Sequence, residues 1–216
     1  MRFDRSDPIR QRNNIPVICS GYAFKILAFL VRIALRICHP VIRIRGKENI
    51  PSQGAVLCAN HSSFSDPLWV IAYGGLCKLP RTMAKKELFH NPILSKLFAY
   101  LGAFPVDRGN TDIAAIKTSM QTLKDGNKLL IFPEGTRVRK GKEVTPHSGA
   151  VLIAHRMGAP IVPIYLSQKK GLFRPIDLII GKAYFTDFGG TKPDATQLDL
   201  SAHEMINTIY SMGELL

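Results

Sequence analysis

Residues 55–73, AVLCANHSSFSDPLWVIAY, contain the signals of a strand, a turn and a helix in direct succession. The run AVLCA at 55–59 is short and apolar, which is typical of a buried strand. Asp66 and Pro67 fit the N-cap and the first position of a helix that continues as LWVIAY. A strand that leads into a helix is the repeating unit of α/β folds. The segment therefore predicts the fold class, and it places residues 60–65 in the turn.

The same alternation of strand and helix continues along the chain after this segment. Short apolar runs predict strands at 129–132, 161–166 and 178–185, and helical spacing predicts helices at 112–124, 148–157 and 201–211. We expect a single α/β domain with a largely parallel mixed sheet flanked by helices. In such folds ligands bind where strands end and loops begin.

The charge of the chain indicates an anionic partner. The formal net charge is +13 over 216 residues, and residues 1–47 hold ten basic side chains against two acidic ones, which is +8 of that total. Nucleic acid, an acidic protein, an anionic membrane and a phosphorylated substrate all fit this balance. The four cysteines are about twenty residues apart without a metal-binding pattern, so we expect reduced thiols in a cytosolic protein and no metal site.

The basic N-terminal segment includes GYAFKILAFLVRIALRI at 21–37. Lys25, Arg32 and Arg36 fall within a sector of roughly 40° on a helix, with His39 close beside them, and apolar residues cover the rest of the circumference. We expect a helix in the headgroup layer of a membrane, with its cations toward lipid phosphates. A core helix with a solvated basic stripe is the alternative, and a membrane-spanning helix is the weaker hypothesis because the charges interrupt the apolar run.

His61 is the candidate for chemistry in the turn that follows the run at 55–59. It precedes Asp66 by five residues, so the carboxylate can hold one ring nitrogen while the other faces a substrate, as in a general base. A metal site is the rival hypothesis, but no further His or Cys lies nearby in the sequence. Serine hydrolysis stays a minor alternative, because three serines lie between the pair although no G-x-S-x-G motif occurs.

Two further segments carry basic residues on turns. GAFPVDRG at 102–109 contains Arg108, although an exposed Asp–Arg pair would explain this loop as well. In FPEGTR at 132–137, Gly135 allows backbone N–H groups to approach an anion, and Arg137 can bind phosphate in a bidentate manner. The spacing of a nucleotide-binding loop is absent, so the segment predicts a phosphate site without implying ATP.

In order and spacing, the segments NHSSFSDP (60–67), GAFPVDRG (102–109), FPEGTR (132–137) and IVPI (161–164) resemble the four motif blocks of the glycerolipid acyltransferases. The most similar type is the 1-acyl-sn-glycerol-3-phosphate acyltransferases, and the resemblance covers roughly residues 45–185. It implies transfer of a fatty acyl group from acyl-CoA or acyl-carrier protein to the free hydroxyl of lysophosphatidate, giving phosphatidate, without a cofactor.

The resemblance also implies roles for individual residues. His61 would be the general base, and Asp66 would orient and charge its imidazole. The glycerol phosphate would be held by Arg108, Gly135, Thr136 and Arg137, with Lys85 as a weaker candidate. Asn60 and Glu134 would support the site rather than perform chemistry.

The resemblance implies an acyltransferase domain at 48–216 behind a membrane-interface segment at 1–47, located at the cytoplasmic face of a membrane. Its partners would be the anionic membrane surface, lysophosphatidate and the acyl donor, with no nucleic acid. Two alternatives stay open. One is a different acceptor, such as glycerol 3-phosphate or another lysophospholipid. The other is a basic nucleic-acid-binding module, although the sequence has no helix-turn-helix, RNA-recognition or zinc-finger signature.

Overall fold

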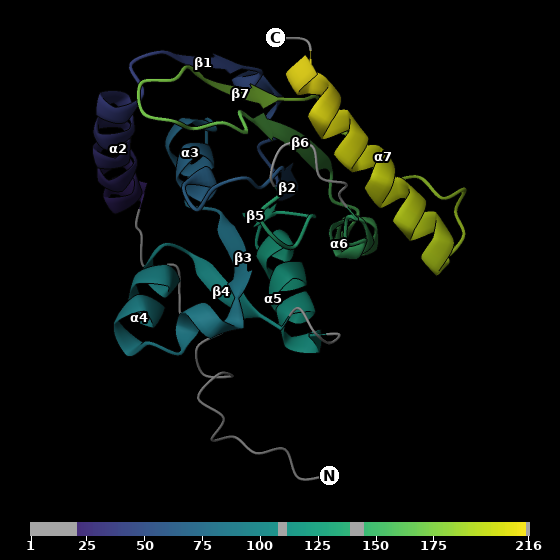
Figure 1. Cartoon of the computed structure of the whole chain (residues 1–216). Helices are drawn as coiled ribbons and strands as arrows, with labels where there is room; N and C mark the ends of the chain where they lie inside the picture. Colours follow the sequence, from purple (N-terminus) through teal and green to yellow (C-terminus); the bar gives the residue numbers. More distant parts are fainter. Residues whose placement is uncertain (1–20, 108–111, 139–144, 215–216) are drawn as a thin grey trace.

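The structure, a computed structural model, describes residues 21–107, 112–138 and 145–214. These residues form a seven-stranded sheet in the order β1-β7-β6-β2-β5-β3-β4 (Figure 1). All neighbouring strands are parallel except β6 and β7, which are antiparallel. The strands are β1 (Ile42–Arg45), β2 (Ala55–Ala59), β3 (Arg81–Lys85), β4 (Ala103–Val106), β5 (Lys128–Ile131), β6 (Ile161–Leu166) and β7 (Ile176–Ile180).

Helices cover both faces of this sheet. The α-helices are α2 (Gly21–Cys38), α3 (Asp66–Tyr73), α4 (Pro92–Tyr100), α5 (Ile113–Lys124), α6 (Gly149–Met157) and α7 (Ala195–Glu214), and the short 3-10 helices are η1 (Lys47–Asn49) and η2 (Lys86–Phe89). One core lies between the sheet and α5, α6 and α7, and the other lies under α3 and α2. In β2, Val56 and Cys58 enter the first core while Ala55, Leu57 and Ala59 enter the second, which explains why this strand is apolar at every position.

The expected single α/β domain with a mixed, mostly parallel sheet is confirmed. The strands at 55–59 and 161–166 have the predicted bounds, and the strand at 129–132 is shifted by one residue. The strand expected at 178–185 is instead 176–180, because the chain leaves the sheet at Gly181 and Tyr184 forms only an isolated bridge with Ile161. The helix expected at 201–211 is the middle of the longer α7.

Strand β1 lies inside residues 1–47, the segment that was expected to contact the membrane. It nevertheless pairs with β7 at the edge of the sheet, from Ile42 opposite Ile176 to Arg45 opposite Ile179. The alternation of IRIR buries one side only in part and exposes the other. The sheet therefore begins before residue 48, and residues 1–20 lie outside the described part.

Helix α2 packs against α3, but its basic stripe does not face outward as a unit. Ala28 is buried in a small cluster with Ile71 and Leu79, and the Arg32 guanidinium donates from Nε to the carbonyl of Ala72 at 2.5 Å. His39 lies beyond the helix and is buried, with Nδ1 3.2 Å from the carbonyl of Arg174. His39 is therefore buried rather than turned toward lipid phosphates, whereas Arg32 stays exposed while its Nε contacts the domain.

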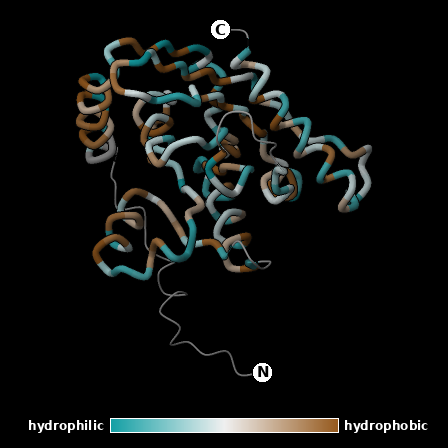
Figure 2. The backbone as a smooth tube through the Cα atoms, viewed as in Figure 1, coloured by the Kyte–Doolittle hydropathy of each residue, from teal (hydrophilic) through white to brown (hydrophobic). Residues whose placement is uncertain are grey.

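Most residues of α2 are hydrophobic, so the tube of this helix is largely brown in Figure 2. Its exposed large side chains are Tyr22, Ile26, Phe29, Leu30, Ile33 and Ile37, which are 44–81% exposed. Lys25 and Arg36 are exposed as well. Within the described ranges, no helix combines the length and the hydropathy that crossing a bilayer requires.

Candidate functional site

The predicted motif segments meet at one edge of the sheet. Strands β2, β5, β3 and β4 are parallel neighbours in that order, so their carboxyl ends lie side by side. His61 follows β2, the segment 132–137 follows β5, and Lys85 ends β3. Arg108 belongs to the loop after β4 and lies outside the described residues.

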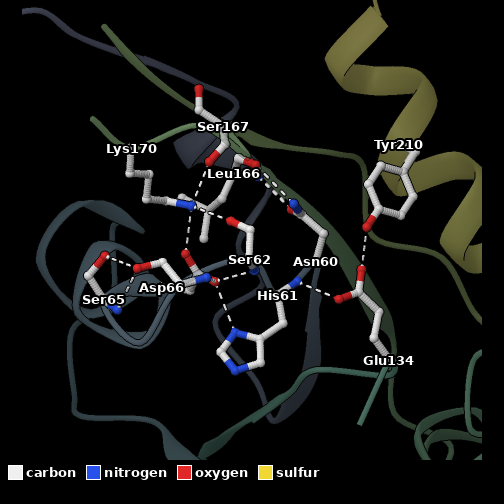
Figure 3. Close-up of polar contacts among 11 residues, drawn as sticks. Asn60, His61, Ser62, Ser65, Asp66, Glu134, Leu166, Ser167, Lys170 and Tyr210 are labelled. Atoms are coloured by element: carbon white, nitrogen blue, oxygen red, sulfur yellow. Dashed lines mark hydrogen bonds and ion pairs between the residues drawn. The ribbon is translucent and has the colours of Figure 1, made fainter. Parts of the chain in front are cut away.

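His61 and Asp66 form a direct pair (Figure 3). Nδ1 of His61 lies 2.9 Å from Oδ2 of Asp66, whose side chain is fully buried. The same oxygen accepts the backbone N–H groups of Ser62 and Ser63, each at 2.7 Å. Because an ionised carboxylate can only accept, Nδ1 carries the proton in this pair, and the lone pair of the imidazole is on Nε2.

The expected N-cap role of Asp66 is wrong. Helix α3 begins at Asp66 itself, and Ser65 occupies the cap position without a side-chain cap bond. The carboxylate instead accepts the amides of the turn that holds His61. One residue therefore starts the helix and shapes the turn before it.

Asp66 is held in its ionised form by what surrounds it. Burial alone would raise its pKa, but the hydrogen bond with His61, the ammonium of Lys170 and the Ser63 amide outweigh burial and lower the pKa. Nζ of Lys170 lies 2.7 Å from the second carboxylate oxygen, Oδ1. Lys170 was not foreseen from the sequence. The available signal was its position four residues after β6, the strand beside β2.

The turn after β5 is bound to the backbone of His61 by two hydrogen bonds, one to its N–H and one to its carbonyl. The His61 N–H donates to Oε2 of Glu134 at 2.9 Å, and the Val138 N–H donates to the His61 carbonyl at 2.8 Å. The ring of Phe132 stacks on the imidazole with 4.3 Å between centroids. The segment predicted to bind phosphate therefore lies directly beside the predicted base.

Arg137 and Thr136 are exposed at this turn. The Arg137 guanidinium lies 3.6 Å from the ring centroid of Phe64, which belongs to the first motif segment. Gly135 has a φ of +63°, and a Cβ there would come within 2.5 Å of the ring of His147. A glycine is therefore required by both conformation and space.

Two buried polar residues brace the site from behind (Figure 3). The Asn60 amide donates to the carbonyl of Leu166 and accepts the N–H of the same residue, which ties the end of β2 to the end of β6. Glu134 accepts the hydroxyl of Tyr210, from α7, at 2.5 Å. Burial raises the pKa of Glu134 to about 7, against the lowering effect of its bonds with Tyr210 and the His61 amide.

Lys85 is not drawn into this cluster by the described contacts. Its ammonium lies 3.6 Å from Glu87 and is half exposed. The neighbouring Lys86 pairs with Asp107 at 2.5 Å instead, between η2 and the end of β4. Lys85 thus stands at the same sheet edge as His61, two strands away.

A cavity of about 510 Å³ reaches Phe132, the residue that stacks on His61. Phe132 forms part of its wall as well as the stacking surface of His61. Most of the wall is apolar, and the polar groups near it come from Asp107, Asp112, His147 and Ser148. Its apolar lining residues are Met83, Val106, Ala115, Ile116, Ile131, Phe132, Pro133, Ala150 and Ile153.

In the part of the chain that the structure describes, no group of three or more His, Cys, Asp or Glu side chains is arranged to hold a metal ion. Cys38, Cys58 and Cys77 are free thiols there. An imidazole oriented by an ionised carboxylate lies beside an exposed arginine and an apolar cavity, which suits removal of a proton from a hydroxyl on an amphipathic anion.

Comparison with known proteins shows which family this chain resembles. The family model described as Acyltransferase matches residues 41–167. The 1-acyl-sn-glycerol-3-phosphate acyltransferase of Bacillus subtilis is 38% identical over 65% of this chain and 72% of that protein. The chloroplastic enzyme LPAT1 of Arabidopsis thaliana is 33% identical, but the match covers only 35% of its length and 58% of this chain.

Among solved structures, the fold matches the crystal structure of the 1-acyl-sn-glycerophosphate (LPA) acyltransferase PlsC from Thermotoga maritima with a TM-score of 0.68. That match covers 90% of this chain and 80% of the other, at 22% sequence identity. It supports the fold rather than the activity.

Proposed function

Because the chain belongs to the acyltransferase family, we propose that it transfers a fatty acyl group from an acyl thioester to the free hydroxyl of 1-acyl-sn-glycerol 3-phosphate, giving phosphatidate. The observation that carries this proposal is the 2.9 Å pair of His61 and Asp66, fastened through Glu134 and Val138 to the turn that bears Arg137. The named activity of the Bacillus relative supports the choice of acceptor.

In the proposed mechanism, Nε2 of His61 removes the proton from the acceptor hydroxyl as the oxygen attacks the thioester carbonyl. The carbonyl π electrons move to oxygen, and the tetrahedral intermediate then collapses, breaks the C–S bond and releases the thiolate, which takes the proton from the imidazolium. Asp66 stabilises the imidazolium between these steps. The acceptor is itself the nucleophile, so no acyl-enzyme forms. A positioned base of this kind contributes about 10²–10⁴-fold in rate.

The phosphate of the acceptor is assigned to the turn after β5. Arg137 supplies a guanidinium that is stacked on Phe64 and exposed toward an incoming ligand. Gly135 gives this turn its shape through its positive φ and its N–H bond to the Phe132 carbonyl, and the exposed Thr136 adds a hydroxyl. Arg108 is proposed to complete this group from the neighbouring loop, and Lys85 is proposed as a more distant contributor.

The cavity beside Phe132 is the proposed place of an acyl chain. Its walls are apolar, its volume is about 510 Å³, and it reaches the residue that stacks on His61. An acyl group that enters it would have its carbonyl end near the base. The donor is proposed to be acyl-CoA or acyl-carrier protein, since both present a thioester and negative charges to a basic protein.

Helix α2 is proposed to dock the enzyme on the cytoplasmic face of an anionic membrane, ahead of an acyltransferase domain whose sheet begins with β1 at Ile42. Its outward face carries exposed Phe29, Ile33 and Ile37, and Lys25 and Arg36 are exposed along the same helix. Exposed apolar surface flanked by cations suits the interface of a bilayer.

Acylation of an acceptor panel tests this proposal. Purified protein on anionic liposomes is supplied with palmitoyl-CoA, or with palmitoyl-carrier protein, and with lysophosphatidate, glycerol 3-phosphate or lysophosphatidylcholine. We expect phosphatidate from lysophosphatidate with kcat/KM at least tenfold above the other acceptors. Equal use of lysophosphatidylcholine, which has no free phosphate monoester, would contradict the phosphate site. The Arg137→Ala variant should lose the preference for lysophosphatidate.

A further inference from the structure

Lys170 is a buried cation that the mechanism above does not use. Its side chain is only 6% exposed, and its ammonium has three acceptors around it. These are Oδ1 of Asp66 at 2.7 Å, Oγ of Ser62 at 2.7 Å and the carbonyl of Ser167 at 2.5 Å (Figure 3). Three acceptors match the three protons of an ammonium. A buried charge that is fully paired in this way has a defined position.

Lys170 and His61 hold opposite sides of one carboxylate. Oδ2 of Asp66 is used by His61 and by two backbone amides, whereas Oδ1 faces Lys170. The ammonium comes from the loop after β6, so it fixes the carboxylate from an element separate from the turn that carries the histidine. The orientation of the carboxylate, and through it that of the imidazole, depends on both anchors.

The charge of Lys170 also acts on the proton affinity of the imidazole. A buried carboxylate alone would favour the protonated ring, which cannot act as a base. The ammonium on the far side opposes that effect. Among the described residues, the other titratable or charged groups near this cluster are Glu134, which binds the His61 amide, Tyr210 behind it, and Arg137 on the turn after β5.

We propose that Lys170 is a positioning residue of the acyl transfer, which acts through Asp66 to orient the carboxylate and to keep His61 unprotonated at physiological pH. The inference rests on the proposed function for its catalytic meaning. The effect of Lys170 on Asp66 and His61 can be tested without that function. Burial lowers the pKa of Lys170, while the charge of Asp66 and its hydrogen bond act to keep the ammonium protonated.

A serine–lysine dyad with Ser62 as nucleophile is the competing use of the same contact. It needs a neutral amine that accepts the hydroxyl proton. The three acceptors around Nζ favour the ammonium instead, which donates to Ser62. Under our proposal, Ser62→Ala lowers kcat less than Lys170→Met does, because it removes one of the three acceptors of Nζ and no chemical group. A loss as large as that of Lys170→Met or larger would favour the dyad and overturn the proposal.

The experiment compares Lys170→Met with Lys169→Met, which removes an exposed lysine one residue away. We expect Lys170→Met to lower kcat on the order of 10–100-fold with KM changed less than threefold, a fraction of the full contribution of the base. The acid limb of its kcat/KM profile should move up by about one pH unit, as expected for loss of a nearby charge. Lys170→Arg, which keeps the charge, should restore the position of that limb. Lys169→Met should match wild type throughout.

A second readout does not depend on turnover. NMR titration of the His61 imidazole should give a midpoint about one pH unit higher in Lys170→Met than in Lys169→Met. If Lys170→Met does not fold, Lys170→Gln removes the charge while keeping a donor and serves in its place. An unchanged midpoint overturns the proposal. Absence of turnover in wild type would sink the proposed function alone, and the titration would still decide the role of Lys170.

Discussion

Glu134 should make the free energy of unfolding depend on pH, because burial raises the pKa of this carboxyl in the folded state. The side chain is 4% exposed, and its pKa is about 7 against an ordinary 4.5. A carboxyl whose pKa is higher in the folded state stabilises the fold below its unfolded value, and this contribution is lost as the pH rises through the folded value. The window therefore runs from about pH 4.5 to about pH 7.

The size of the effect follows from that interval. At about 1.36 kcal/mol per pH unit, the interval between the unfolded and folded pKa values of Glu134 corresponds to roughly 3 kcal/mol of unfolding free energy. Glu134→Gln removes the titration while keeping an acceptor for the His61 amide. The free energy of unfolding of wild type, minus that of Glu134→Gln, should therefore fall by roughly this amount between pH 4.5 and pH 7.5 and change little above it.

Urea denaturation followed by circular dichroism at half-unit pH steps measures this difference. Other titrating groups cancel in the subtraction, and Glu48→Gln, at an exposed position, should show no such slope. A difference that stays constant across the range would refute the reasoning, since it would mean that Glu134 ionises normally in the fold. Because Glu134 is assigned a supporting role, kcat of Glu134→Gln should stay within about fivefold of wild type at pH 7.5.

Three further predictions concern the turn, the arginine and the membrane helix. Gly135→Ala should lower the free energy of unfolding, measured in urea, by about 2–3 kcal/mol. The control Gly126→Ala is also at positive φ but in open space, so it should cost only about 1 kcal/mol. Equal costs for the two variants would contradict the contact of Gly135 with His147. Phe64→Leu should raise the KM for lysophosphatidate about two- to fivefold in steady-state assays and leave kcat unchanged, because the guanidinium of Arg137 loses its stacking surface. An unchanged KM would count against a role of Phe64 in positioning Arg137. Ile33→Glu should reduce flotation with anionic liposomes at least tenfold, and full flotation would argue against docking through α2.

The fold class and two central strands could be predicted because burial on both faces produces continuous apolar runs. Residues 55–59 and 161–166 are such runs, and both occupy the middle of the sheet. Strand β1 escaped notice because it is a short strand at the sheet edge whose alternation of Ile and Arg resembles a charged linker. The order of strands depends on packing between distant segments, which local patterns do not report.

The site shows the same division between local and distant contacts. His61 and Asp66 are five residues apart in one turn, so their pairing could be expected from the sequence. Lys170 reaches the same turn from 108 residues beyond Ser62, and Tyr210 reaches Glu134 from the last helix. Stacking of Phe64 on Arg137 likewise joins two loops. Such partners become visible only when the parallel strands bring their loops to one edge.

The most direct test of the proposed chemistry is the rate at which His61→Ala forms phosphatidate from lysophosphatidate and palmitoyl-CoA at saturating substrate. We predict a loss of about 10²–10⁴-fold in kcat, with KM for lysophosphatidate within about threefold of wild type because Arg137 and its turn remain. The folded state of the variant is verified by its urea midpoint. Turnover by folded His61→Ala at the wild-type rate would contradict the assignment of the base.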